Sequence, residues 1–210
     1  AISEVYGLDR FAEYMKDMED CYTVIGGTAC DIIFEGADLP FRITKDIDLI
    51  LIIENRFPEG ASAVWKMVKD GGYTCGWKSS DTVHFYRFTS PKAVGFPSMI
   101  ELFSKAPSFI EAPEELTIVP LPADEENQAF SILLDENYYA YMKSGRKTIN
   151  GVTVLDEVHL VPFSKGDIDL FARKARGEHV NSGDLKKHKK DVFRLAQLFG
   201  PNTSSELVPQ

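Results

Sequence analysis

The sequence predicts an α/β (α+β) protein in which a mixed sheet is flanked by helices and is followed by a small helical C-terminal region. Over the first half of the chain, segments with apolar residues at spacings of three and four alternate with short β-branched or aromatic runs. The last three of these runs follow one another with no helix between them. This order favours a mixed, mainly antiparallel sheet over a purely parallel, doubly wound one.

Each element has a local reason. The run Leu49–Ile53 is the most apolar stretch of the chain and predicts a buried strand. The next helix is expected to begin near Pro58, which suits a first helical turn, and to end at Gly71-Gly72. Helices are expected over 4–19 (with Ser3 as N-cap), 28–34, 58–71, 124–144, 164–176 and 184–199. Strands are expected over 22–25, 46–53, 73–77, 83–88, 99–103 and 152–155, with a hairpin connection at 89–97.

Composition changes after residue 106. Four prolines, at positions 107, 113, 120 and 122, fall within sixteen residues. We therefore expect a core at 1–106, a Pro-rich connection at 107–123, and a mostly helical region at 124–210.

The bulk properties are those of an ordinary globular chain. Of its 210 residues, 44% are hydrophobic and 26% are charged, and the net charge is −9, which argues against a general nucleic-acid coat. No apolar run is long enough to span a bilayer, the N-terminus does not look like a signal peptide, and the three cysteines have no metal-type spacing. We expect a cytoplasmic protein without a membrane partner, with buried cysteines. One basic segment, 173–194, holds eight Lys and Arg against three acids.

The segment from Gly26 to Asp48 carries the chemistry. Gly26, Gly27 and Thr28 form a turn before a helix, where unpaired N–H groups and the helix dipole make an anion site. Asp46 and Asp48 stand two apart on a strand, so their carboxylates share a face and repel each other unless a cation neutralises them. A divalent metal beside a phosphate-binding turn suggests chemistry on a nucleoside triphosphate (NTP). The ordinary alternatives are a simple strand–helix turn and two solvated acids.

Two runs carry a family resemblance: Gly-Gly-Thr-Ala at 26–29, and Arg-x-Thr-x-Asp-x-Asp within Phe41 to Asp48. Together they resemble the motifs of the nucleotidyltransferase superfamily (the polymerase-β-like fold). The closest likeness is to AbiEii-type nucleotidyltransferase-like toxins, and it covers roughly residues 20–105. The resemblance implies Mg²⁺ or Mn²⁺ as cofactor and a third carboxylate on a later strand. Glu101 occupies that place, where the family more often has Asp.

The resemblance also implies roles for particular residues. Its metal ligands and catalytic groups are Asp46, Asp48 and Glu101. Its nucleotide-binding residues are Gly26, Gly27, Thr28, Arg42, Lys174 and Lys190. Local pairing of Arg42 with an acid such as Asp38, and a solvated helix face around Lys174 and Lys190, are the competing interpretations.

The function that follows is transfer of a nucleoside monophosphate from NTP–Mg to an acceptor hydroxyl by two-metal chemistry. RNA, a protein hydroxyl and a small molecule all stay open as the acceptor. A toxin-like enzyme would also have an antitoxin protein as partner. The alternative is a non-catalytic module of the same fold that acts through a protein or nucleotide partner, which the Glu at position 101 keeps open. The four histidines show no ligand spacing, and no Ser–His–Asp arrangement, P-loop or zinc signature is expected.

Overall fold

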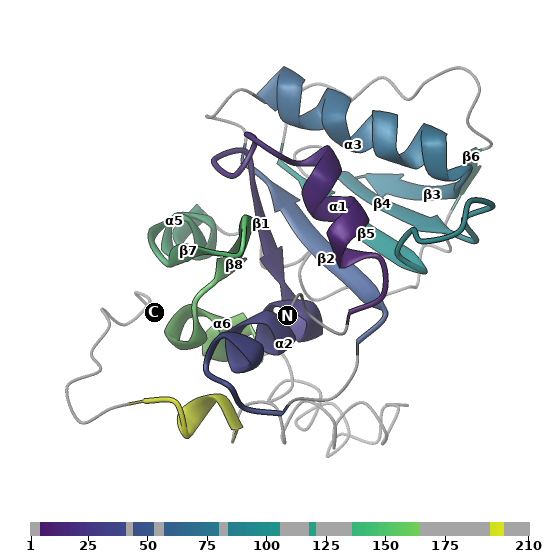
Figure 1. Cartoon of the computed structure of the whole chain (residues 1–210). Helices are drawn as coiled ribbons and strands as arrows, with labels where there is room; N and C mark the ends of the chain where they lie inside the picture. The colour runs from purple at the N-terminus through teal and green to yellow at the C-terminus, as the bar shows by residue number, and fades with distance from the viewer. Residues whose placement is uncertain are drawn as a thin grey trace, which may run out of the picture.

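One mixed sheet organises the molecule (Figure 1). The computed structural model describes residues 5–40, 44–52, 57–79, 84–105, 118–120, 136–163 and 194–199. The strands are β1 (Tyr22–Ile25), β2 (Asp46–Leu51), β3 (Thr74–Ser79), β4 (His84–Thr89), β5 (Met99–Ser104), β6 (Ile118–Pro120), β7 (Arg146–Ile149) and β8 (Val152–Leu155). The helices are α1 (Leu8–Tyr14), α2 (Gly26–Gly36), α3 (Phe57–Gly71), α5 (Glu136–Ser144) and α6 (Glu157–Phe163).

The strand order is β6-β3-β4-β5-β2-β1-β8-β7. The pairs β1–β2, β3–β4, β4–β5 and β7–β8 are antiparallel, and the pairs β1–β8, β2–β5 and β3–β6 are parallel. The expected mixed α/β sheet is therefore confirmed, and so is the antiparallel connection between β4 and β5.

Two strands were not expected from the sequence, and both lie at the edges of the sheet. β6 falls in the Pro-rich connection and pairs with β3. An edge strand tolerates a proline such as Pro120 where the missing N–H would point away from the neighbouring strand. β7 is Arg-Lys-Thr-Ile, without apolar alternation, and it pairs only with β8 among the described strands. Their hairpin turns at Asn150 (φ 49°) and Gly151 (φ 80°), the backbone of a tight two-residue turn.

The first helix is shorter than expected. It begins at Leu8 instead of residue 4, because Gly7 has a left-handed backbone (φ 80°) and packs against Pro97. A Cβ on Gly7 would lie 2.3 Å from the Pro97 nitrogen, so this turn is fixed by a contact ninety residues away in sequence. Ser3, the expected N-cap, lies outside the described residues.

The helices after residue 120 were only partly anticipated. Of the expected helix 124–144, the described part is α5, and the expected helices 164–176 and 184–199 lie outside the described residues apart from 194–199. Helix α6 was not among the expected helices. Asp156 caps its start by accepting from the His159 amide at 2.8 Å.

Helices α1 and α3 cover one face of the sheet (Figure 1). The Phe11 ring of α1 meets Tyr22 edge-on at 5.4 Å, and the Trp65 ring of α3 lies 5.5 Å from both Tyr86 and Phe88. Because side chains alternate along β4, Arg87 projects from the opposite face. The register then puts Glu101 and Asp48 on the face of Arg87.

The sheet takes strands from all three expected parts of the chain: β6 comes from the Pro-rich connection, and β7 and β8 come from the C-terminal region. The boundaries at 106 and 123 stay predictions. Among the helices in the described ranges, none has the length and apolarity to cross a bilayer. The cytoplasmic location also stays a prediction.

Candidate functional site

The glycine turn and the second aspartate of the Asp-x-Asp pair are in contact. Ile25, at the end of β1, is paired with Asp48 of β2. Gly26 follows with a left-handed backbone (φ 67°), and a Cβ there would lie 2.5 Å from Asp48 Oδ2. Only glycine permits both this backbone and this approach. The Asp48 carboxylate therefore lies at the N-terminus of α2, an eleven-residue helix whose positive dipole end favours negative charge.

Asp46 and Asp48 lie on one face of β2, at the start of the strand. Asp46 is exposed, Asp48 is half-buried, and Ile47 between them is fully buried on the other face. Gly26 and Gly27 are also half-buried. This part of the chain therefore offers carboxylate oxygens and a helix N-terminus at one partly accessible edge.

Thr28 makes buried structural contacts between α2 and the segment that carries the aspartates. Its side chain is fully buried, its hydroxyl donates to the Asp46 carbonyl at 2.5 Å, and it lies 3.2 Å from the Thr44 hydroxyl. These contacts tie the first turn of α2 to the strand that carries the aspartates. A role for Thr28 toward phosphate stays a prediction.

Glu101 lies beside Asp48 on the adjacent strand, in the same register. Its Oε1 accepts from Arg87 Nε at 2.8 Å and lies 2.8 Å from an Arg87 terminal nitrogen in an ion pair; the Glu101 side chain is 13% exposed and the Arg87 side chain 22%. The guanidinium also lies over the Phe85 ring, 5.4 Å from its centre. Two carboxylates on neighbouring strands repel, and the Arg87 charge offsets that repulsion.

Sequence reasoning missed Arg87. Alternation within 84–89 separates Arg87 from the aromatic face of Tyr86 and Phe88, and that was the available signal. The partner of Arg87 could not be predicted from the sequence, because Arg87 lies beside Glu101 only when β4 pairs with β5.

The carboxylates near Gly26 are the side chains that could hold a divalent metal ion. Within the described ranges, no group of three or more His, Cys, Asp or Glu side chains is placed to hold a metal ion. Mg²⁺ commonly uses one or two carboxylates with substrate phosphates and waters. Asp46 and Asp48 fit that smaller set, whereas Glu101 is engaged by Arg87.

The remaining predicted site residues, Arg42, Lys174 and Lys190, lie outside the described residues. The three cysteines are buried thiols, as expected, and burial raises the pKa of the Cys75 thiol to about 12. A cavity of about 130 Å³ between α1, α2 and the β7–β8 hairpin is lined by Leu8, Asp9, Ala12, Ile32, Glu35, Ile149, Asn150 and Val152. It contains none of the predicted site residues.

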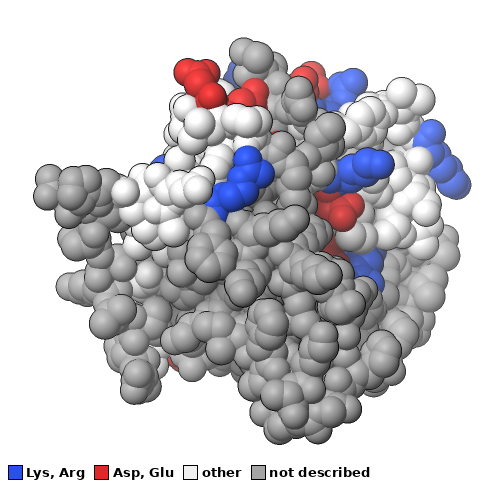
Figure 2. Space-filling view, turned by 90° about the horizontal axis from the view of Figure 1, so that it is seen from below, with Lys and Arg blue, Asp and Glu red and all other residues white. Residues whose placement is uncertain are grey.

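Seen from below, the described part of the surface shows acidic and basic side chains interspersed, without a field of one sign (Figure 2). The described surface on this side therefore does not argue for a polyanionic partner.

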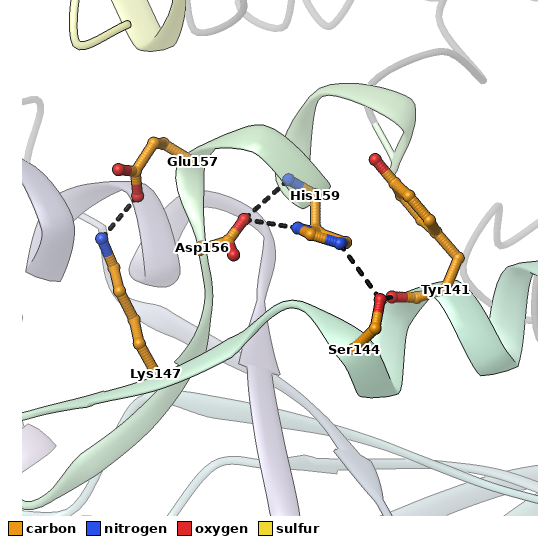
Figure 3. Close-up of polar contacts among 6 residues, drawn as sticks. All are labelled: Tyr141, Ser144, Lys147, Asp156, Glu157 and His159. Atoms are coloured by element: carbon orange, nitrogen blue, oxygen red, sulfur yellow. Dashed lines mark hydrogen bonds and ion pairs between the residues drawn. The ribbon is translucent and has the colours of Figure 1, made fainter. Parts of the chain in front are cut away.

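The expectation of no Ser–His–Asp arrangement is wrong. Ser144, at the end of α5, and Asp156, before α6, both contact the His159 ring (Figure 3). The sequence did not signal this group, because Ser144 is fifteen residues from His159 and meets it only when the β7–β8 hairpin folds.

Comparisons with known proteins give little. No protein-family model and no curated protein matches the chain. Among solved structures, the chain is similar to an antigenic nucleotidyltransferase-like protein from Paracoccidioides brasiliensis, with 16% identity over 92% of this chain and 75% of that one, at a TM-score of 0.45.

Proposed function

We propose that this protein binds an NTP with Mg²⁺ or Mn²⁺ and transfers the nucleoside monophosphate to an acceptor hydroxyl. The contact between Gly26 and Asp48 carries the proposal. Gly26 belongs to a turn that suits phosphate, and Asp48 offers a carboxylate that suits a metal. The two residues lie apart in the sequence but meet at the N-terminus of α2.

In this proposal each residue has a limited task. Asp46 and Asp48 hold the metal, and the amides at Gly26 and Gly27 bind phosphate oxygens. The metal, when bound, stabilises charge on the transferring phosphoryl group. Glu101 is the candidate base for the acceptor proton. It would have to act while Arg87 contacts its Oε1 or after Arg87 has moved.

The test is thermal stability with each NTP, with and without Mg²⁺. A ligand that binds only the folded state adds about 2.7 kcal/mol at a hundred times its Kd. We expect a Mg²⁺-dependent rise in Tm with at least one NTP, and we expect it to be lost when Asp46→Asn and Asp48→Asn are combined. No shift with any NTP at millimolar concentration would contradict the proposal.

The matched control is Asp17→Asn. Asp17 is an exposed aspartate outside the candidate site whose left-handed backbone (φ 63°) also suits Asn. This variant removes one negative charge, as Asp46→Asn and Asp48→Asn each do, and it should keep the NTP response. A loss of response in Asp17→Asn would mean that net charge, and not the site, governs binding.

The ion pair between Arg87 and Glu101 favours a second candidate, a non-catalytic module that binds a nucleotide or protein. Pyrophosphate release separates the two. An enzyme should lose release in Glu101→Gln while keeping NTP binding, and should keep or gain it in Glu101→Asp. A module should bind NTP without release when RNA, protein or small-molecule acceptors are supplied. A toxin-like role adds an antitoxin partner, and copurification would support it.

A further inference from the structure

A chain of polar contacts links Ser144, His159 and Asp156 outside the proposed nucleotide site (Figure 3). His159 Nδ1 lies 2.7 Å from Asp156 Oδ1, and His159 Nε2 lies 3.2 Å from Ser144 Oγ. The Ser144 hydroxyl also lies 2.7 Å from the Tyr141 carbonyl. The hydroxyl thus has two possible acceptors for its proton.

The contact with Asp156 decides the state of the ring. An ionised carboxylate only accepts, so Nδ1 must carry a proton at 2.7 Å. In the neutral imidazole, Nε2 is then the acceptor, and it faces Ser144 Oγ. When the ring is doubly protonated, Nε2 donates to Oγ and the hydroxyl donates to the Tyr141 carbonyl. The neutral ring is therefore arranged as a base for the Ser144 proton.

The neighbours hold the ring in this place. A Cβ on Gly145 would lie 2.0 Å from His159 Cγ, so the ring can sit here only because residue 145 is glycine. The Tyr141 ring packs on the imidazole, with 4.3 Å between centres. The His159 side chain is 14% exposed, whereas Ser144 is exposed, so a reagent can approach the hydroxyl while the base is kept in position.

We propose that Ser144 is a nucleophilic serine that takes up activated esters, with His159 as its base and Asp156 as a positioning residue. Oγ attacks the electrophilic centre and forms a new bond to it, the leaving group departs with its bonding electrons, and the Ser144 proton passes to His159 Nε2. The Gly145 amide donates to the Met142 carbonyl at 3.2 Å, so this amide is already used and does not serve as an oxyanion donor. We therefore expect stoichiometric capture of activated esters and no rapid turnover of amides.

The probe is a tagged fluorophosphonate applied to the folded full chain. An Oγ–P bond forms, the P–F bond breaks, and fluoride leaves. Intact mass and peptide mapping should place one adduct on Ser144. It should be absent in Ser144→Ala and unchanged in Ser98→Ala, which alters another exposed serine.

Two further variants separate a base from a structural clamp. A positioned base contributes roughly a hundredfold or more, so His159→Gln should slow labelling by about that factor. Asp156→Asn keeps an N-cap for α6, because Asn caps as well as Asp, yet it should also slow labelling. Melting curves for each variant will show whether the chain stays folded.

The pH dependence supplies a readout that a purely structural role would not move. Wild-type labelling should depend on pH, because only a neutral imidazole can accept the Ser144 proton, and this dependence should vanish in His159→Gln. The ionisable groups against the ring in the described residues are Asp156 and Tyr141, while Lys147 and Glu157 pair with each other nearby. Absence of a Ser144 adduct, or equal rates in His159→Gln and wild type, would overturn the proposal and leave the group as a clamp between α5 and α6.

Discussion

At the scale of single residues, Gly26 is the position where the candidate site most directly requires one particular amino acid. Its left-handed backbone alone makes a residue such as Ala costly by about 1–2 kcal/mol. A side chain would also displace the Asp48 carboxylate, since the added Cβ would lie 2.5 Å from Oδ2. The two costs can be separated by experiment.

We expect Gly26→Ala to lower the free energy of unfolding by more than Gly95→Ala does. Gly95 also has a left-handed backbone (φ 84°), but nothing lies within 4 Å of a Cβ there. Gly95→Ala therefore measures the backbone cost alone, and the excess in Gly26→Ala measures the contact with Asp48. Urea unfolding gives both values. Equal losses would show that Asp48 moves aside without cost.

At the scale of elements, Thr28 joins α2 to β2. Removal of its buried hydroxyl in Thr28→Val leaves the Asp46 carbonyl without this donor, which costs about 1–3 kcal/mol. Thr28→Ser keeps the hydroxyl and loses one methyl group, so it should retain more stability. Chemical unfolding of both variants tests this. The idea fails if Thr28→Val is as stable as Thr28→Ser.

The start of α6 is linked to β7 by an ion pair, with Lys147 Nζ 2.5 Å from Glu157 Oε2. Burial raises the pKa of Glu157, but the hydrogen bond from Lys147 and a backbone hydrogen bond outweigh it, so the pKa lies below the ordinary 4.5. Because the folded pKa is the lower one, ionised Glu157 stabilises the fold above pH 4.5. That contribution is lost as pH falls through the folded pKa.

Glu157→Gln should therefore lower Tm at pH 7, and the difference from wild type should shrink as the pH falls below 4.5 and through the folded pKa. Glu13→Gln is the control, since Glu13 is 67% exposed in its pair with Arg10 and should change Tm little. Melting curves across this pH range decide the point. A difference that stays constant as the pH falls would assign the effect to packing.

At the scale of the whole molecule, the strand order predicts how stability is distributed. β1 is fully buried and lies between β2 and β8, whereas β7 is half-buried at one edge. We expect amide hydrogen exchange to be slowest in β1, β2 and β5 and fastest in β7 among the described strands. Protection of β7 equal to that of β1 would mean that another part of the chain covers this edge.

Much of the fold could be predicted because local patterns report local structure. Apolar runs and alternation predicted six strands within a few residues, and glycine and proline marked their ends. The edge strands β6 and β7 were not predicted, because a strand at the edge of a sheet needs no apolar alternation. Helix α1 was predicted too long, because the turn at Gly7 is fixed by Pro97.

By itself, the sequence determined the mixed sheet and the carboxylates at the head of β2, because both depend on the spacing of neighbouring residues. Only the tertiary structure decided that Gly26 touches Asp48, that Arg87 holds Glu101, and that Ser144 meets His159. Each of these contacts joins residues at least fourteen positions apart. Their partners are chosen by strand pairing and packing, which no local spacing reports.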